Sequence, residues 1–139
     1  MNRVSKSEQA EAIARLREWI KPGDTVYTIL RSVSRSGMSR TLDIFIIHAE
    51  TPRPLANITW HVAEALNLSR ERNTGAIKMG GCGYDAGFDV VYSLGRKLFA
   101  DGFTCIGEHC PSNDHTNGDR DYTPHPHTDP GYALRHEWI

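Results

Sequence analysis

The chain lacks the long apolar segments and the cysteine-rich patterns that would place it among membrane or secreted proteins. No apolar run approaches the roughly 20 residues that a transmembrane helix needs. Residues 1–20 are amphipathic and do not show the basic-then-apolar order of a secretory signal. Only three cysteines occur, and an odd number without such a signal does not suggest a disulfide framework. We therefore expect a cytoplasmic protein with no membrane partner.

The chain also has little excess charge of either sign, because its formal net charge is −1. The balance changes along the sequence: residues 1–103 contain 14 Lys/Arg and 11 Asp/Glu, whereas residues 104–139 contain 2 and 6. This distribution excludes a uniformly basic coat for nucleic acid and leaves room only for a local basic site.

Length and composition are otherwise those of an ordinary globular domain. Hydrophobic residues make up 39% of the chain and charged residues 24%, values that suggest neither disorder nor a fibrous class. A chain of 139 residues supports one hydrophobic core, so residues 1–139 are expected to form a single domain.

Local patterns predict an α+β fold. Ser5 and Glu8 have the spacing of a capping box, and apolar residues then recur at helical intervals. Residues 25–33 and 41–48 are rich in β-branched and aromatic types, which is typical of the two strands of a hairpin. We predict a small antiparallel sheet with about three helices and a long Cys/His-rich carboxyl-terminal loop. The strands are the 25–48 hairpin, 76–79 and 132–138, and the helices lie near 7–20, 58–67 and 85–99.

The predicted loop at 104–131 differs in composition from the rest of the chain. It contains four of the seven prolines, four of the seven histidines and two of the three cysteines. A loop of this length has no core of its own and needs another source of order. Zinc binds thiolate and imidazole groups, and a closed zinc site would supply folding free energy. The predicted zinc ligands come from Cys105, Cys110, His115, His125 and His127.

Other interpretations of this loop stay open. Its histidines are also compatible with a proline-stiffened loop in water, and a Cys105–Cys110 disulfide is a further alternative. A metal with one coordination position open to water would instead activate a nucleophile. The sequence Asn113-Asp-His115 with Asn117 is similar in part to nucleases built on His and Asn, although it lacks their strand-strand-helix context.

A second candidate site is the tip of the predicted hairpin, which has the sequence RSVSRSGMSR at residues 31–40. Arginine offers bidentate donors to phosphate, and a glycine turn exposes backbone N–H groups. We expect Arg35 and Arg40 to contact phosphate through solvated side chains whose removal hardly changes stability. An ordinary exposed turn is the alternative, as is pairing of the arginines with Asp43 or Asp85. The predicted ligand-binding residues are Arg31, Ser34, Arg35, Ser36, Gly37, Ser39 and Arg40.

A third segment, GGCGYDAG at residues 80–87, lies between a predicted strand and a predicted helix. A glycine turn followed by a helix amino terminus can receive an anion, so Gly81 and Gly83 join the predicted ligand-binding residues. The segment has neither a phosphate-loop motif nor the spacing of a dinucleotide-binding fingerprint. Tight packing of the strand against the helix is therefore the interpretation that we favour.

Three blocks of the sequence resemble a group of small uncharacterised proteins encoded in bacteriophage and prophage genomes. The blocks are VSRSGMSRTLDIF, GGCGYDAGFDVVYSLGR and CPSNDHTNGDRDYTPHPHTDPGYALRHEWI, and the likeness covers roughly residues 25–139. The group has no assigned activity, so the resemblance implies a setting rather than a mechanism. It implies an accessory protein, acting in an infected bacterial cell, that binds a host defence component or its nucleotide signal.

These observations lead to two hypotheses. The first is a binding protein that is not an enzyme and whose partner is a nucleotide, a nucleic-acid backbone or a host defence protein. In that case the hairpin and the glycine turn hold the partner, and the zinc loop is structural. The second is a metal-dependent phosphodiester hydrolase or nuclease, which an open metal coordination position would distinguish from the first.

Overall fold

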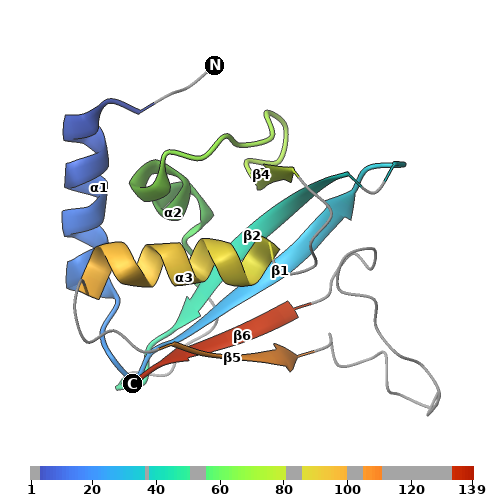
Figure 1. Cartoon of the computed structure of the whole chain (residues 1–139). Helices are drawn as coiled ribbons and strands as arrows, with labels where there is room; N and C mark the ends of the chain where they lie inside the picture. The colour runs from blue at the N-terminus through green and yellow to red at the C-terminus, as the bar shows by residue number, and fades with distance from the viewer. Residues whose placement is uncertain (1–3, 37, 51–55, 81–85, 100–104, 111–132) are drawn as a thin grey trace, which may run out of the picture.

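The structure, a computed structural model, describes residues 4–36, 38–50, 56–80, 86–99, 105–110 and 133–139 (Figure 1). The helices are α1 (Lys6–Trp19), α2 (Thr59–Leu66) and α3 (Ala86–Phe99). The strands are β1 (Thr25–Val33), β2 (Ser39–Ile47), β3 (Ala56–Asn57), β4 (Ile77–Gly80), β5 (Cys105–Cys110) and β6 (Ala133–Trp138). The predicted α+β fold, a small antiparallel sheet with three helices in the described residues, is confirmed.

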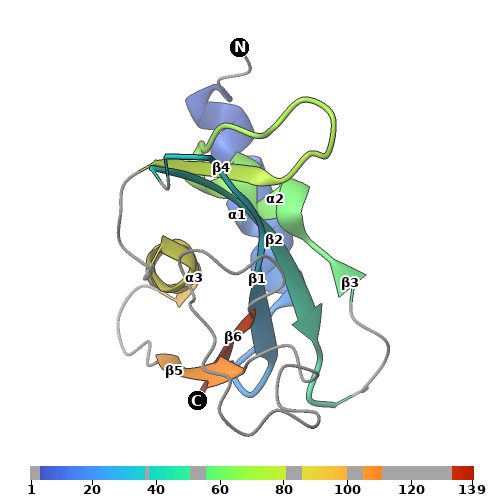
Figure 2. The same cartoon turned by 90° about the vertical axis from the view of Figure 1, so that its right-hand side faces the viewer.

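The strands form one sheet in the order β3-β2-β1-β6-β5, and β4 also pairs with β2. All of these pairs are antiparallel. The two short strands β3 and β4 pair with opposite ends of β2, as Figure 2 shows. Both β1 and β2 therefore have neighbours on each edge. The apolar run at residues 44–47 therefore lies in a central strand and not at an edge of the sheet.

Alternate residues of the central strands form the core. Val26 and Leu30 of β1 are buried, as are Leu42, Ile44 and Ile46 of β2, because successive side chains of a strand point to opposite faces. These side chains belong to one hydrophobic cluster with residues of all three helices. The opposite face is more polar, and it contributes Ser32, Thr41 and Lys78 to the candidate site.

Hydrogen bonds hold the start of α1 and the turn that follows the helix. The predicted capping box is present, because Ser5 Oγ accepts from the Glu8 N–H at 3.2 Å and Glu8 Oε1 accepts from the Ser5 N–H at 3.0 Å. After the helix, the buried carboxylate of Asp24 accepts from the N–H of Lys21 at 2.9 Å and from that of Ala49 at 3.0 Å. Asp24 thereby joins the turn before β1 to the end of β2.

Three features of the sheet were not predicted. Residues 105–110 form β5, although they were assigned to the loop at 104–131; the remaining residues of that loop lie outside the described ranges. The two-residue strand β3 follows Pro54 and is too short to show a period-two pattern. The hairpin has a bulge at Arg31, because Leu30 pairs with Leu42 whereas Ser32 pairs with Thr41.

No helix in the described part of the chain is both long enough and apolar enough to span a lipid bilayer.

Gly87 lies where α3 packs most closely on the sheet. A Cβ atom at this position would lie 2.6 Å from Thr28 Cγ2 and 3.3 Å from Leu134 Cδ1. Thr28 Oγ1 also donates to the Gly87 carbonyl at 3.3 Å, so the helix and β1 meet through a hydrogen bond as well. The tight strand-helix packing favoured for the 80–87 segment is thus present at Gly87.

We predict that Gly87→Ala lowers stability by roughly 1–3 kcal/mol, because the added methyl group overpacks the contact with Thr28. Helix propensity alone would change stability by about 1 kcal/mol in the opposite direction, so the sign of the effect is informative. Chemical denaturation of both proteins provides the measurement. Gly80→Ala is the matched control, since nothing lies within 4 Å of its Cβ position. A Gly87→Ala protein as stable as the control would contradict the packing that we describe.

Candidate functional site

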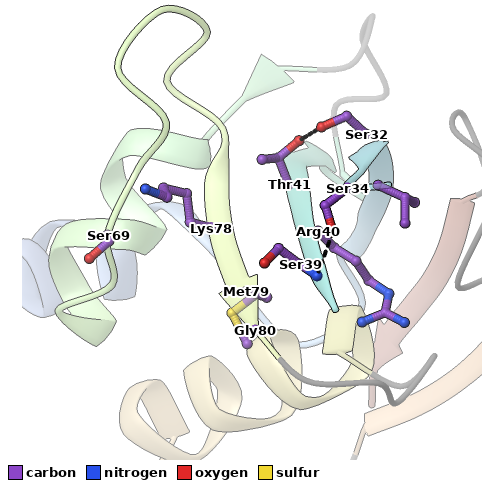
Figure 3. A pocket seen from close by; sticks show the side chains of 10 residues that line it. Ser32, Ser34, Ser39, Arg40, Thr41, Ser69, Lys78, Met79 and Gly80 are labelled. Carbon is purple, nitrogen blue, oxygen red and sulfur yellow. Dashed lines mark hydrogen bonds between the residues drawn. The ribbon is translucent and has the colours of Figure 1, made fainter. Parts of the chain in front are cut away.

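A pocket of about 420 Å³ lies where β1, β2 and β4 come together near the hairpin tip (Figure 3). Its lining is rich in hydroxyl groups, which come from Ser32, Ser34, Ser39, Thr41 and Ser69. Two positively charged residues, Arg40 and Lys78, also line it. The remaining lining residues are Val33, Met79 and Gly80. The described lining therefore contains donors for an anion and no carboxylate.

The register of three strands brings part of this set together. Thr41 of β2 pairs with Ser32 of β1 on one side and with Lys78 of β4 on the other. Directly opposed residues of neighbouring strands point to the same face, so the three side chains form a row across the sheet. The hydroxyls of Ser32 and Thr41 are 2.6 Å apart, as the dashed line in Figure 3 shows.

The hairpin tip adds hydroxyls that are already held in place. The Ser34 N–H donates to the Ser39 carbonyl at 2.9 Å, and Ser34 Oγ accepts from the Ser39 N–H at 3.1 Å. Ser34 Oγ also lies 3.2 Å from Ser36 Oγ. These bonds close the turn locally and leave the Ser39 hydroxyl at the pocket, where Figure 3 shows it. A preorganised hydroxyl costs little entropy when it binds a ligand.

Lys78 is the accessible positive charge of the pocket. Its side chain is exposed, and none of the described carboxylates forms a salt bridge with it. The neighbouring segment supports its strand, because the Lys78 N–H donates to the Ser69 carbonyl at 2.8 Å. An ammonium group on a flexible stem can follow a bound phosphate as a point charge.

Arg31 is neutralised by a carboxylate. Its Nη1 atom lies 2.7 Å from Asp43 Oδ2, and the side chains of Arg31 and Asp43 are 48% and 10% exposed. The alternative interpretation of the tip paired Arg35 and Arg40 with Asp43 or Asp85, whereas the structure pairs Asp43 with Arg31. This residue does not line the pocket.

Arg40 differs from the expectation of a solvated tip residue. It is only 3% exposed, because alternation along β2 places it on the same face as Leu42 and Ile44. It nevertheless lines the pocket from within the strand. The prediction that its replacement hardly changes stability is wrong in its premise, since a buried side chain contributes to packing.

The other predicted ligand-binding residues have different positions. Ser34 and Ser39 line the pocket with Arg40, whereas Arg35 and Ser36 are exposed at the tip and are not part of the lining. Gly37, Gly81 and Gly83 lie outside the described residues. Four polar lining residues were not predicted from the sequence, namely Ser32, Thr41, Ser69 and Lys78. For Ser32, Thr41 and Lys78 the signal is a hydroxyl or cation at paired strand positions, which becomes visible only when the register is known.

The predicted zinc ligands are separated by β5. Cys105 and Cys110 begin and end this extended strand, so their Cα atoms are about 16 Å apart. Two sulfurs bound to one zinc ion lie within roughly 4.6 Å of each other, and a disulfide needs Cα atoms within about 7 Å. A Cα separation of about 16 Å exceeds both limits, so the extended backbone of β5 is incompatible with a Cys105–Cys110 disulfide or with one zinc ion shared by the two residues. His115, His125 and His127 lie outside the described residues, so zinc binding itself stays a prediction.

Cys105 instead lies beside a histidine that was not predicted to be a site residue. Its Sγ atom is 3.9 Å from Nδ1 of His136, a completely buried residue of β6. Burial raises the pKa of the Cys105 thiol to about 11 and lowers the pKa of His136 to about 4. Both groups are therefore neutral near pH 7, which suits a thiol packed against an imidazole. No cluster of three or more metal-ligating side chains occurs in the described ranges.

We expect that at least one of the variants Cys105→Ser and Cys110→Ser retains whatever zinc the wild type contains. The reason is that the extended backbone of β5 holds the Cα atoms of the two cysteines too far apart for one shared ion. Elemental analysis of the purified proteins measures the metal content, which the loop composition predicts to be about one zinc per chain. Loss of zinc in both variants, with folding preserved, would mean that β5 is not extended between these cysteines.

A second prediction concerns the acid stability that follows from His136. The unfolded chain protonates this imidazole near its ordinary pKa of 6.5, whereas the folded chain does so only near pH 4. Between these values the unfolded state binds more protons, so stability falls as the pH is lowered from about 6.5 to about 4. Across this window the free energy of unfolding falls by roughly 3 kcal/mol.

The measurement is urea denaturation of the wild type and of His136→Leu at several pH values. The variant should lose less stability across this window, whatever its stability at pH 7. Parallel curves for the two proteins would show that His136 does not titrate as its burial requires.

Comparison of the chain with protein-family models, with curated proteins and with solved structures found no match. The candidate ligand site of the described residues is the pocket at the hairpin tip, with its hydroxyl groups and its exposed lysine.

Proposed function

We propose that this chain is a binding protein for a phosphate-bearing ligand, either a nucleotide or a nucleic-acid backbone. The observation that carries the proposal is the composition of the pocket, in which five hydroxyls and two cations occur without a carboxylate in the described lining. Phosphate oxygens accept hydrogen bonds only, and they favour a site that offers donors and positive charge.

The positions of the donors support this choice. Ser32, Thr41 and Lys78 form one row across three strands, so a single anion can contact hydroxyl and ammonium groups together. A cation would gain from the hydroxyl oxygens but would be repelled by Lys78. A neutral apolar ligand would leave the hydroxyls without partners in the bound state, which costs free energy.

Binding rather than catalysis agrees with the same lining. A hydroxyl nucleophile is most often activated by a histidine or a carboxylate, and the described lining contains no His, Asp or Glu. The alternative of a metal-dependent phosphodiester hydrolase depends on residues 111–131, which lie outside the described ranges. No observation on the described residues favours it.

The resemblance to bacteriophage proteins supplies a setting for this activity. An accessory phage protein that binds a nucleotide signal or a nucleic acid would deprive a host defence system of its ligand. This part of the proposal depends on the resemblance alone. The chemistry of the pocket is independent of it, since the same donors would bind phosphate in any cellular setting.

We predict that Lys78→Ala weakens binding of a phosphate-bearing probe about tenfold, the loss expected when one charged hydrogen bond is removed. The probes are ATP, measured by calorimetry, and a fluorescent 12-nucleotide single strand, measured by anisotropy. Wild-type affinity should fall with added salt, and the slope of log K against log salt should be smaller for the variant.

Lys97→Ala is the matched control, because it removes the same charge from the exposed surface of α3. It should bind both probes as the wild type does. If the wild type binds neither probe, or if the two lysine variants weaken binding equally, the pocket is not a phosphate site.

A further inference from the structure

An exposed tryptophan contacts Arg70, the residue that follows the pocket residue Ser69. Trp60 is the second residue of α2 and is 58% exposed, although its neighbours Ile58 and Val62 are fully buried. The helix therefore directs this large aromatic ring outward while the rest of its turn joins the core. A single exposed aromatic residue is ordinary in itself. Trp60 is of interest because Arg70 and His61 lie beside its ring.

Two planar groups accompany the Trp60 ring. The guanidinium carbon of Arg70 lies 5.2 Å from the ring centroid, within cation–π distance. The imidazole of His61 is nearly parallel to the indole, with an interplanar angle of 11° and a centroid distance of 6.3 Å. Trp60 and Arg70 thus present aromatic and guanidinium planes together, and both residues are exposed. Nucleic-acid bases stack on surfaces of this kind.

The backbone connects this pair to the pocket. Arg70 directly follows Ser69, whose side chain lines the pocket. The Ser69 carbonyl accepts from the Lys78 N–H at 2.8 Å, and Arg70 forms a β-bridge with Ile77. The segment at 69–70 is therefore held against β4, with Ser69 at the pocket and Arg70 at the tryptophan.

We propose that the pocket and the Trp60–Arg70 pair form one site for single-stranded nucleic acid. A backbone phosphate lies in the pocket, against Lys78 and the hydroxyls, and an adjoining base stacks on Trp60. The inference rests on the proposed function, since it assigns that phosphate to a polynucleotide. It also goes further, because a duplex offers no free base face to Trp60, whereas a free nucleotide is separated from a strand by the comparison of ATP with the 12-nucleotide probes.

The ligand is single-stranded because stacking requires a free base face. In a duplex, each base is covered above and below by its neighbours, whereas an unpaired base can stack on an aromatic side chain. Deoxyribose and ribose strands share the required phosphate and base, so either sugar is compatible with the described contacts.

Charge favours a polyanion over a protein partner at this surface. Arg70, Arg72 and Lys78 are all exposed around the 69–78 segment. The acid among them, Glu71, is engaged within the loop, because its Oε2 accepts from the N–H groups of Asn73 at 2.6 Å and Thr74 at 3.2 Å. The exposed charge near Trp60 on this segment is thus positive, which complements a phosphate backbone.

The test measures the anisotropy of fluorescent 12-nucleotide strands of DNA and RNA and of the corresponding DNA duplex. We expect Trp60→Ala to weaken binding of single strands about tenfold, the loss typical of one base–aromatic stack. Trp60→Phe should restore much of the affinity, because phenylalanine retains an aromatic face. The duplex should bind more weakly than the single strand, and the DNA and RNA strands decide between the two sugars.

Tyr92→Ala is the control, since it removes an exposed aromatic ring from α3 instead of α2. It should bind as the wild type does, and thermal unfolding of each variant verifies folding. Single-strand binding that Lys78→Ala weakens and Trp60→Ala does not would overturn the stacking inference and leave the phosphate pocket intact. Binding of ATP without binding of either strand would overturn it as well. Equal loss in Trp60→Ala and Trp60→Phe would assign Trp60 to other contacts, such as a protein interface.

Discussion

The bulge at Arg31 is the constraint on which the candidate site depends. Side chains alternate along a strand, so a shift of one residue in pairing moves every later side chain to the opposite face. Because Arg31 is the extra residue, Ser32 pairs with Thr41 and not with Arg40. Ser32 therefore shares a face with Thr41 and Lys78. Without the bulge its hydroxyl would point toward the side of Leu42 and the core.

The same bulge explains why Arg31 and Arg40 of the hairpin have different environments. Arg31 leaves the ladder and forms its ion pair with Asp43, which removes one positive charge from the tip. Arg40 stays in register on the buried face. The accessible charge of the pocket is consequently supplied by Lys78, from a strand that lies about 40 residues later in the sequence. The candidate site at the hairpin tip therefore obtains its accessible charge only from this third strand.

At the other edge of the sheet, β5 and β6 place Cys105 beside His136 and separate it from Cys110. A strand of six residues is long enough to keep its two ends from sharing a small ligand. The short Cys-x4-Cys spacing suggested a common metal only while the segment was assumed to be a loop. The pairing with β6 instead gives Cys105 a partly buried environment, in which a neutral thiol is favoured.

Short-range patterns were sufficient to predict most of the fold. The capping box at Ser5, the β-branched strands of the hairpin and the apolar stripe of α3 depend on residues within a few positions of each other, so they can be read from the sequence. The serines and arginines of residues 31–40 also predicted a polar site that includes Ser34, Ser39 and Arg40, and these three residues line the pocket. The bulge at Arg31, the burial of Arg40, strand β5 and the contacts of Ser69 with Lys78 and of Arg70 with Trp60 depend on the approach of distant segments. Only the tertiary structure decides these features, because register and burial are properties of two elements in contact and are not encoded in either element alone.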